Sequence, residues 1–213
     1  MKKISTEDFF TPAEQERIRL AVASAEKATS GEIATMVVPR SDSYREAVTL
    51  AAVLGAATVA LIIAVISQHV TIWSYLPVTI VLFFPLHLLV NRVPALQRPF
   101  IAPSRLHEAV QERAVRAFYE KGLYRTRDET GILIFISIFE HKVWILGDRG
   151  INARIPAASW QELVQILVAG LKGGRAGEAL CEVITRCGDE LAIHFPRKAD
   201  DMNELHDEIL VGR

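Results

Sequence analysis

The stretch AVTLAAVLGAATVALIIAVISQHVTIWSYLPVTIVLFFPLHLLVN, from Ala47 to Asn91, contains no aspartate, glutamate, lysine or arginine. The chain has 213 residues, and its 24 basic and 25 acidic residues all lie outside this stretch. A uniform globular chain would spread its charges along the whole sequence, because the outer face of each helix or strand contacts water. The sequence therefore predicts an apolar block between two polar segments.

The charge-free block is long enough for two helices that each cross a membrane. About 20 apolar residues span the hydrocarbon of a bilayer, and we place such helices at about Val48–Ser67 and Val70–Val90. Gln68-His69, with Trp73 and Tyr75 nearby, is typical of a tight turn at the membrane interface. A cleaved signal peptide is not expected, because no small-residue cleavage site directly follows the first apolar run. A buried helical hairpin of a soluble protein is the alternative.

Basic residues flank the block on its two outer sides. Arg40 and Arg45 precede the first span, Arg92, Arg98 and Arg105 follow the second, and the short loop between the spans has no lysine or arginine. The positive-inside rule places such basic flanks in the cytoplasm. We therefore expect both polar segments, and both chain termini, on the cytoplasmic side.

The segment before the block predicts a helix and then a strand. Thr11-Pro12-Ala13-Glu14 combines a cap, a proline at the first helical position and a glutamate three residues after the cap. The β-rich run Glu32–Val38 follows and is ended by Pro39. Ser41-Asp42 is expected to cap a further helix that continues into the first span.

The segment after the block begins with a proline-containing linker at Arg92–Pro103. A helix is then expected to open at Ser104 and to stop at Gly122. Ile132–Phe139 and Lys142–Leu146 predict a β-hairpin. The remaining expectations are helices at Pro156–Leu171 and Arg175–His194, and a loosely attached charged tail after Pro196 with Leu205 and Ile209 at helical spacing.

This order of elements predicts an α/β fold with a small mixed sheet. Neither polar segment has enough strands for a sheet of its own. We therefore expect the strand Glu32–Val38 to pair with the strands beyond residue 131, so that a transmembrane hairpin interrupts one domain. The predicted parts are residues 1–46 and 92–196 for the domain, 47–91 for the hairpin and 197–213 for the charged tail.

Two aspartates at one edge of the predicted β-hairpin are the candidate metal ligands. Asp128 precedes the first strand, and Asp148 follows the second within Gly147-Asp148-Arg149-Gly150. In an antiparallel hairpin these positions lie at the same edge. Oxygen ligands on loops suit Ca²⁺ or Mg²⁺, and glycines around an aspartate suit a backbone nest. The alternative is that both aspartates are solvated turn residues beside Arg127 and Arg149.

Several other classes of function find little support in the sequence. The net charge of −1 includes no basic field that would indicate nucleic-acid binding. His107-Glu108 lacks the second histidine of a zincin helix, and uncharged spans do not favour a transporter. Cys181 and Cys187 point about 120° apart on one predicted helix, so free thiols are expected. No nucleophile and base pair is identifiable, and no catalytic residue is assigned.

Several motifs together resemble the TPM domain family, and in particular its bacterial branch of small uncharacterised membrane proteins. They are Thr29–Ile33, Arg125–Ser137, Val143–Ile151, Arg186–Gly188 and His194–Pro196. The resemblance covers about residues 5–196 apart from the inserted hairpin. It implies a helix/sheet/helix sandwich, in agreement with the order of elements.

The resemblance also implies several functions and partners. Family members in photosynthetic organisms are linked to photosystem II repair with a reported acid phosphatase activity, some domains bind calcium or a similar cation, and animal members modulate a membrane receptor. Asp128 and Asp148 fall where the family places acidic residues near its cation-binding loops. Bacterial relatives are often encoded beside LemA-type membrane proteins, which implies such a protein as a partner.

The sequence departs from the family in two ways. Gly147–Gly150 reads Gly-Asp-Arg-Gly where many members have Gly-x-Gly-Leu-Glu, and the domain is predicted to be cytoplasmic where many members are lumenal or periplasmic. Our hypothesis is therefore a non-enzymatic accessory or assembly module in the inner membrane of a bacterium. It binds the lipid bilayer and other membrane proteins, and the sequence also permits a homo-oligomer. The alternative is a weak metal-dependent phosphatase that uses Asp128 and Asp148 with Ca²⁺ or Mg²⁺.

Overall fold

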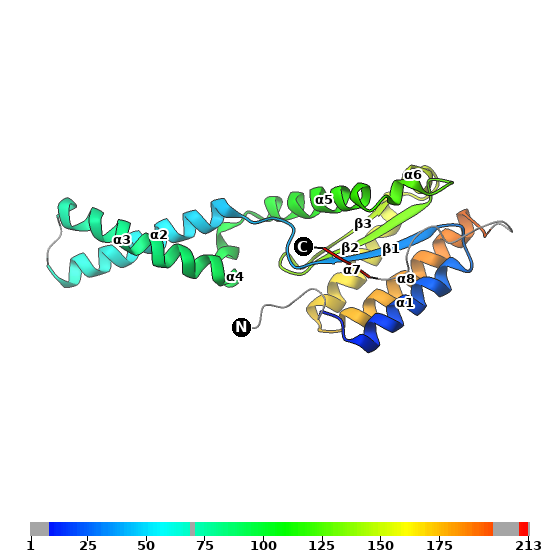
Figure 1. The fold of residues 1–213 in the computed structure, drawn as a ribbon, viewed down its shortest axis with the longest axis horizontal. Coiled ribbons are helices and arrows are strands. Elements are labelled where there is room, and N and C mark those ends of the chain that lie inside the picture. The colour runs from blue at the N-terminus through cyan, green and yellow to red at the C-terminus, as the bar shows by residue number, and fades with distance from the viewer. Residues whose placement is uncertain (1–8, 69–70, 198–208, 213) are drawn as a thin grey trace. The chain divides into compact units, whose positions relative to one another are not determined.

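The computed structural model describes residues 9–68, 71–197 and 209–212. These residues divide into two compact units, one from Met1–Ser41 and His107–Arg213, the other from Asp42–Leu106. The first unit contains helices and strands, and the second contains helices only. Figure 1 labels α1 to α8 and β1 to β3.

A mixed sheet forms the centre of the first unit, with its strands in the order β3-β2-β1-β4. The strands are β1 (Glu32–Val38), β2 (Gly131–Ser137), β3 (Lys142–Gly147) and β4 (Leu210–Val211). β1 pairs in parallel with β2 along its whole length, from Glu32 opposite Gly131 to Val38 opposite Ser137. β2 pairs antiparallel with β3 as a hairpin. The predicted α/β fold with a small mixed sheet is confirmed, as is the pairing of the first strand with the later ones.

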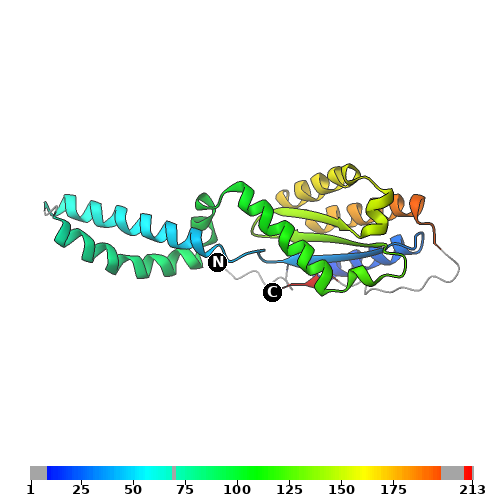
Figure 2. The same ribbon diagram turned by 90° about the horizontal axis from the view of Figure 1, so that it is seen from above.

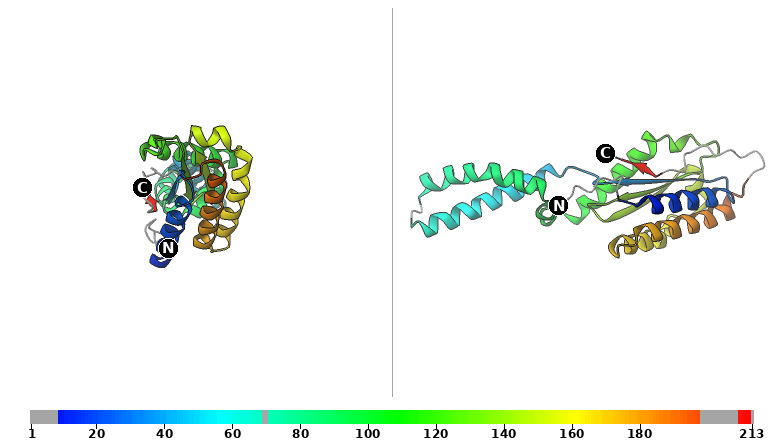
Figure 3. Two further views of the ribbon diagram at one scale, coloured as in Figure 1. Left: turned by 90° about the vertical axis from the view of Figure 1, so that its right-hand side faces the viewer. Right: turned by 60° about the horizontal axis from the view of Figure 1, so that its bottom comes forward.

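Helices cover both faces of this sheet. On one face lie α1 (Pro12–Glu26), α7 (Ala157–Lys172) and α8 (Ala176–His194), and α5 (Pro103–Glu120) lies on the other. Figure 2 shows α5 in front of the strands, and the right-hand view of Figure 3 shows α1 beside α8 on the side of the sheet opposite α5. Parallel strands need a crossover connection, and α5 supplies it between β1 and β2. The second unit is inserted in that connection and ends at Leu106, within the first turns of α5.

Alternate residues of each central strand face opposite layers, which explains why β1 and β2 are buried throughout. In β1, Ile33 and Val37 pack with the layer of α1, α7 and α8. Ala34, Met36 and Val38 pack with α5. A strand covered on both faces needs a continuous apolar run, and this is what the sequence shows at both positions.

The start of α1 follows the predicted capping pattern. Glu14 N–H donates to Thr11 Oγ1 at 3.3 Å, while Glu14 Oε2 accepts from Thr11 N–H at 2.9 Å and from Thr11 Oγ1 at 2.7 Å. The hydrogen bonds from the Thr11 backbone and side chain lower the pKa of Glu14. A lowered pKa in the folded state means that this contribution to stability is lost as the pH falls through the folded pKa.

Two long helices form the body of the second unit: α2 (Arg45–Ile66) and α3 (Ile72–Arg92). They pack against each other along a stripe of small residues on α2, where Ala52, Ala56, Ala60 and Ala64 recur every fourth position and are buried. Small residues let two helix backbones approach closely. By length and composition, both helices are able to cross a membrane. Of the predicted turn, Gln68 has a φ of 54°, and His69 lies outside the described residues.

The predicted linker at Arg92–Pro103 is wrong, because most of it is helical. It contains α4 (Pro94–Gln97) and the 3₁₀ helix η2 (Arg98–Phe100). Gln97 is fully buried, and its Nε2 donates to the backbone oxygens of Val90 at 2.9 Å and Asn91 at 3.2 Å. The side chain thereby satisfies carbonyls at the end of α3. Prolines at the first turn of each short helix are compatible with helix, which the linker interpretation overlooked.

The predicted cap at Ser41-Asp42 is also wrong. α2 begins at Arg45 after Tyr44, which has a left-handed φ of 46° and makes no capping hydrogen bond with its side chain. Asp42 instead accepts from Ser43 N–H at 2.6 Å and pairs with Arg105. The Tyr44 ring is fully buried, and burial of this ring explains why the chain turns here before the helix starts.

The C-terminal residues that the structure describes are not a loose tail. β4 pairs in parallel with β1, with Leu210 opposite Met36, and Gly212 N–H donates to Val37 O at 3.1 Å. Ile209 and Leu210 pack against the two opposite faces of the sheet. Charge dominates the composition after Pro196 and hides this short apolar strand. Leu205 lies outside the described residues.

Candidate functional site

The candidate site lies where β1 and β2 begin and β3 ends. Three loops meet there, at residues 29–31, 126–130 and 147–150. Thr130 joins the first two, because its Oγ1 donates to Ser30 O at 2.9 Å. Within its own loop, Thr130 N–H donates to Thr126 Oγ1 at 3.0 Å. Asp148 N–H joins the third by donating to Gly131 O at 2.8 Å. The loops are thus held together by hydrogen bonds from both backbone and side chains.

Gly150 sets the distance between two of these loops. Its N–H donates to Glu129 O at 3.1 Å. A Cβ atom at this position would lie 2.7 Å from the backbone oxygens of both Asp128 and Glu129. Real Cβ atoms do not approach that closely, so a glycine is required for the loops to meet. Glu129 itself has a left-handed φ of 54°, which turns the chain into β2.

Asp148 is the N-cap of a short helix, α6 (Arg149–Arg154). One carboxylate oxygen, Oδ1, accepts from Arg149 N–H at 2.7 Å. The other, Oδ2, is buried and accepts no hydrogen bond from the residues that the structure describes. A buried carboxylate oxygen without a partner is unfavourable, because it has lost its water without gaining a donor or a cation.

Asp128 is exposed in the turn between the 3₁₀ helix η3 (Leu123–Arg125) and β2. The structure therefore brings the loops of both predicted aspartates together, with Asp148 half-buried and Asp128 at the surface. Around them, Arg149 Nε lies 4.0 Å from Glu129 Oε2. Within residues 9–68, 71–197 and 209–212, no three histidine, cysteine, aspartate or glutamate side chains are grouped to hold a metal ion.

The predicted backbone nest at Gly147–Gly150 is wrong. A nest needs a left-handed residue, and neither glycine has a positive φ. Both glycines are required for packing instead: a Cβ atom on Gly147 would lie 2.7 Å from Ile151 Cγ2, and Gly150 contacts the Asp128 loop. Asp148 followed by Arg149 is a helix start, which the sequence interpretation missed because α6 is only 6 residues long.

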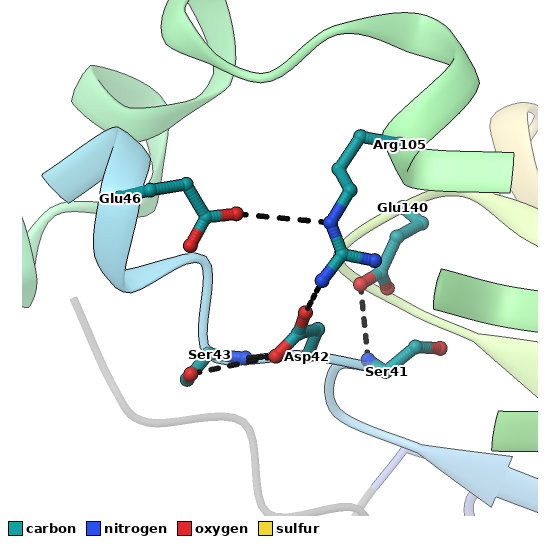
Figure 4. Close-up of polar contacts among 6 residues, drawn as sticks. All are labelled: Ser41, Asp42, Ser43, Glu46, Arg105 and Glu140. Carbon is teal, nitrogen blue, oxygen red and sulfur yellow. Dashed lines mark hydrogen bonds and ion pairs between the residues drawn. The ribbon is translucent and has the colours of Figure 1, made fainter. Parts of the chain in front are cut away.

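A second polar cluster is buried at the opposite end of β2. Glu140 lies in the turn between β2 and β3 and is 3% exposed. Its Oε1 accepts from Ser41 N–H at 2.9 Å, and its Oε2 accepts from Ser137 Oγ. Ser41 Oγ in turn donates to Ser137 Oγ at 2.8 Å. Figure 4 shows the Ser41–Glu140 contact. The sequence interpretation missed this cluster, because nothing in the spacing of these residues indicates that they meet.

The second unit has a polar cluster of its own, where the chain enters and leaves its helices. Arg105 pairs with Asp42 and lies 3.7 Å from Glu46 (Figure 4). Its guanidinium carbon also lies 5.9 Å from the centre of the Tyr44 ring. Arg105 of the predicted basic flank therefore has its charge paired within the protein.

The other singled-out residues are not placed for catalysis. His107 packs edge-to-face on Trp144, with ring centres 5.1 Å apart. Cys181 and Cys187 are free, as expected. Burial raises the pKa of the Cys181 thiol, and it raises that of the Cys187 thiol to about 12. Both are therefore protonated at neutral pH and are poor nucleophiles.

Comparison with known proteins confirms the family resemblance. The family model of the TPM domain matches residues 100–190. This range contains the β2–β3 hairpin, α6, α7 and most of α8. α1 and β1 lie outside the match, although β1 is a central strand of the same sheet. No curated protein matches the chain.

A solved structure shares the fold. It is the NMR structure of BA42 protein from the psychrophilic bacterium Bizionia argentinensis sp. nov., with a TM-score of 0.63 and 24% sequence identity over 100% of both chains. At this level of identity the likeness concerns the fold alone. It supports the arrangement described above, in which helices cover both faces of a mixed sheet.

Proposed function

We propose that this TPM domain protein is a membrane-anchored, non-enzymatic accessory module that binds other membrane proteins. The observation that carries the proposal is the apolar outer surface of α2 and α3. Their exposed large side chains include Leu50, Leu54, Leu61, Ile62, Ile66, Ile80, Val81, Phe84 and Leu88. Of the most apolar 18 residues of each helix, 28% are buried in α2 and none in α3.

A core helix of a soluble protein would be mostly buried. Exposed apolar surface on this scale is unfavourable in water and marks a surface that contacts lipid or another protein. A bilayer is a suitable environment for both helices, because a helix forms its backbone hydrogen bonds internally and needs no water for them. The buried alanine stripe supports the same conclusion, since helix pairs in lipid pack through small residues.

The proposed orientation rests on the difference between the two ends of the hairpin. Arg45 starts α2 and Arg92 ends α3, while Trp73, 86% exposed, lies at the start of α3. Basic residues favour the cytoplasmic side, and tryptophan favours either interface. We therefore place both termini in the cytoplasm of a bacterium, with two crossings of the inner membrane. The TPM family resemblance suggests a LemA-type membrane protein as the partner.

Fractionation of cells that express the full chain tests the anchor. We expect the protein in the membrane fraction after carbonate extraction, and a C-terminal alkaline phosphatase fusion should be inactive because the enzyme folds only in the periplasm. Recovery in the soluble fraction would contradict the anchor, and an active fusion would contradict the orientation. Purification of the full chain from native membranes should yield a reproducible membrane-protein partner. A variant without residues 42–106 should not retain this partner, because it lacks the membrane anchor.

The alternative function, a weak metal-dependent phosphatase, is favoured by one observation, the unpartnered Oδ2 of Asp148. A hard cation such as Ca²⁺ or Mg²⁺ would stabilise this oxygen. The Asp128 side chain and backbone oxygens of the same loop are further candidate ligands, since Ca²⁺ accepts carbonyl oxygens as well as carboxylates. The residues present thus fit a cation, which would supply charge stabilisation for a bound phosphate ester.

Asp148→Asn and Asp148→Ala separate cation binding from helix capping. Asparagine caps a helix about as well as aspartate, so Asp148→Asn should leave the free energy of unfolding in cation-free buffer nearly unchanged, whereas Asp148→Ala should lower it by about 1 kcal/mol. If Asp148 is a ligand, both variants should weaken Ca²⁺ binding by about tenfold or more, measured by calorimetry on the full chain in detergent.

Parallel assays of phosphate-ester hydrolysis distinguish the two functions. We expect no turnover above background in the wild type with either cation. Turnover that Asp148→Asn and Asp128→Asn both abolish would favour the phosphatase. Equal Ca²⁺ binding by wild type and Asp148→Asn would remove Asp148 from the candidate ligands.

A further inference from the structure

Three arginines gather at one end of the helical hairpin and form what we call the arginine collar: Arg45, Arg92 and Arg98. Arg45 is the first residue of α2, Arg92 is the last residue of α3, and Arg98 is the first residue of η2. All three are exposed. The collar lies entirely within the second unit.

Packing within this unit brings the three positions together. Val48 and Ala51 from the start of α2 pack against Val90 near the end of α3. Gln97, directly before Arg98, is bonded through its Nε2 to the backbone oxygens of Val90 and Asn91. η2 also packs against α2. The three arginines of the collar therefore lie on helix ends that are packed and hydrogen-bonded to one another.

The collar arginines differ from Arg105 in their charge partners. Arg105 pairs with Asp42 and Glu46. No carboxylate in the part of the chain that the structure describes forms an ion pair with Arg45, Arg92 or Arg98. Three cations at the same end of the hairpin leave a positive charge there that no ion pair within the described residues offsets, and a bound anion would stabilise it.

Apolar side chains accompany the collar on the same short elements. Leu96 on α4 is 41% exposed, and Phe100 on η2 is 37% exposed. A short segment that combines exposed leucine and phenylalanine with arginine is typical of an interfacial element, which places its apolar side chains among acyl chains and its cations among headgroups. Residues 47–91, which include the far end of the hairpin, contain no arginine or lysine.

We propose that the arginine collar binds the headgroup phosphates of anionic phospholipids, with Leu96 and Phe100 inserted beside them. The proposal rests on the membrane insertion of α2 and α3 and adds a lipid preference to it. The charge of the collar is complementary to anionic headgroups, and arginine donates two hydrogen bonds in a geometry that matches phosphate oxygens. A zwitterionic headgroup presents the same phosphate, but its own cation offsets the attraction of the collar.

Lipid retention by the full chain tests this proposal. The protein in neutral detergent is mixed with equal amounts of phosphatidylglycerol and phosphatidylcholine of the same chain length, and bound lipids are counted by native mass spectrometry. A basic residue near a membrane surface contributes about fivefold in affinity for anionic lipid. We expect the wild type to prefer phosphatidylglycerol by tenfold or more, and Arg45→Gln/Arg92→Gln/Arg98→Gln to lose most of this preference.

Two matched variants show whether the charges of the collar are responsible. The triple lysine variant keeps the charge and should retain most of the preference. A control with Arg17, Arg116 and Arg175 of the first unit changed to glutamine should behave as wild type, because these exposed arginines lie outside the collar. Retained helicity in circular dichroism confirms that each variant is folded.

The remaining outcomes are equally decisive. Equal retention of both lipids by a wild type that resists carbonate extraction would overturn the collar proposal while leaving the membrane anchor intact. A wild type that is soluble without detergent would overturn both. Displacement of phosphatidylglycerol by millimolar inorganic phosphate would show that the collar binds free phosphate, and would overturn the assignment to lipid.

Discussion

Replacement of Leu54 and Leu61 by arginine is expected to release the protein from the membrane. Both side chains lie on the outer surface of α2, with exposed fractions of 48% and 52%. An arginine at the centre of a membrane-spanning helix costs about 2.5 to 3.5 kcal/mol. Leu54 lies near the middle of α2, so this variant should lower the fraction that resists carbonate extraction severalfold, measured by quantitative blotting.

The same change would have little effect on a soluble protein. If α2 were an exposed helix of a soluble protein, arginine would remove apolar surface from the solvent and change stability by only about 0.5 kcal/mol. Leu20→Arg/Ile193→Arg is the matched control, because these residues are 52% and 73% exposed on the first unit. An extraction profile of Leu54→Arg/Leu61→Arg that equals the control profile would refute the membrane anchor.

The parts of the fold that the sequence predicts best are those set by local patterns. β1 lies at Glu32–Val38 as expected, since a run of β-branched residues ended by a proline leaves little freedom. The capping pattern at Thr11-Pro12-Ala13-Glu14 likewise starts α1 where it should. Even the non-local pairing of β1 with β2 was predictable, because each polar segment has too few strands to satisfy a sheet alone.

The parts that the sequence does not predict depend on contacts between distant residues. Asp42 resembles a helix cap, but its partner Arg105 lies 63 positions away in the chain. Gly147 and Gly150 suggest a flexible loop in the sequence. In the structure, Gly150 is a glycine because its backbone lies against the Asp128 loop, which leaves no room for a Cβ atom. At the candidate site, the sequence indicated both aspartates but could not show that one oxygen of Asp148 is buried without a partner.

Replacement of Glu140 is expected to have the largest effect on the stability of the first unit. The residue is 3% exposed and accepts hydrogen bonds from Ser41 N–H and Ser137 Oγ. Glu140→Ala removes both acceptors and leaves a buried hydroxyl and a part-buried N–H without these partners, each at a cost of about 1 to 3 kcal/mol. We expect the free energy of unfolding to fall by about 3 kcal/mol, measured by urea denaturation in detergent with tryptophan fluorescence.

The position of Glu140 explains why this effect matters for the whole protein. The pairing of β1 with β2 continues past the strands, with Ile138 N–H donating to Val38 O at 3.1 Å and Phe139 N–H to Pro39 O at 3.0 Å. Ser41, held by Glu140, is the last residue of the first unit before the chain enters the helical insertion. Loss of the carboxylate should therefore loosen the end of β1 first.

Two further variants distinguish a lost hydrogen-bond network from a general effect of mutation. Glu140→Gln keeps an acceptor oxygen for Ser41 N–H but loses the negative charge that strengthens the bond from Ser137, so its cost should be about 1 kcal/mol. Glu112→Ala, at an exposed position on α5, should change stability by no more than about 0.5 kcal/mol. Hydrogen exchange should show the protection of Ser41, Ile138 and Phe139 amides falling in Glu140→Ala and not in Glu112→Ala. Unchanged protection of these amides would mean that the buried carboxylate does not hold the end of β1. Ser41 N–H donates to the carboxylate directly, and the Ile138 and Phe139 amides donate to backbone oxygens of the segment that leads to Ser41.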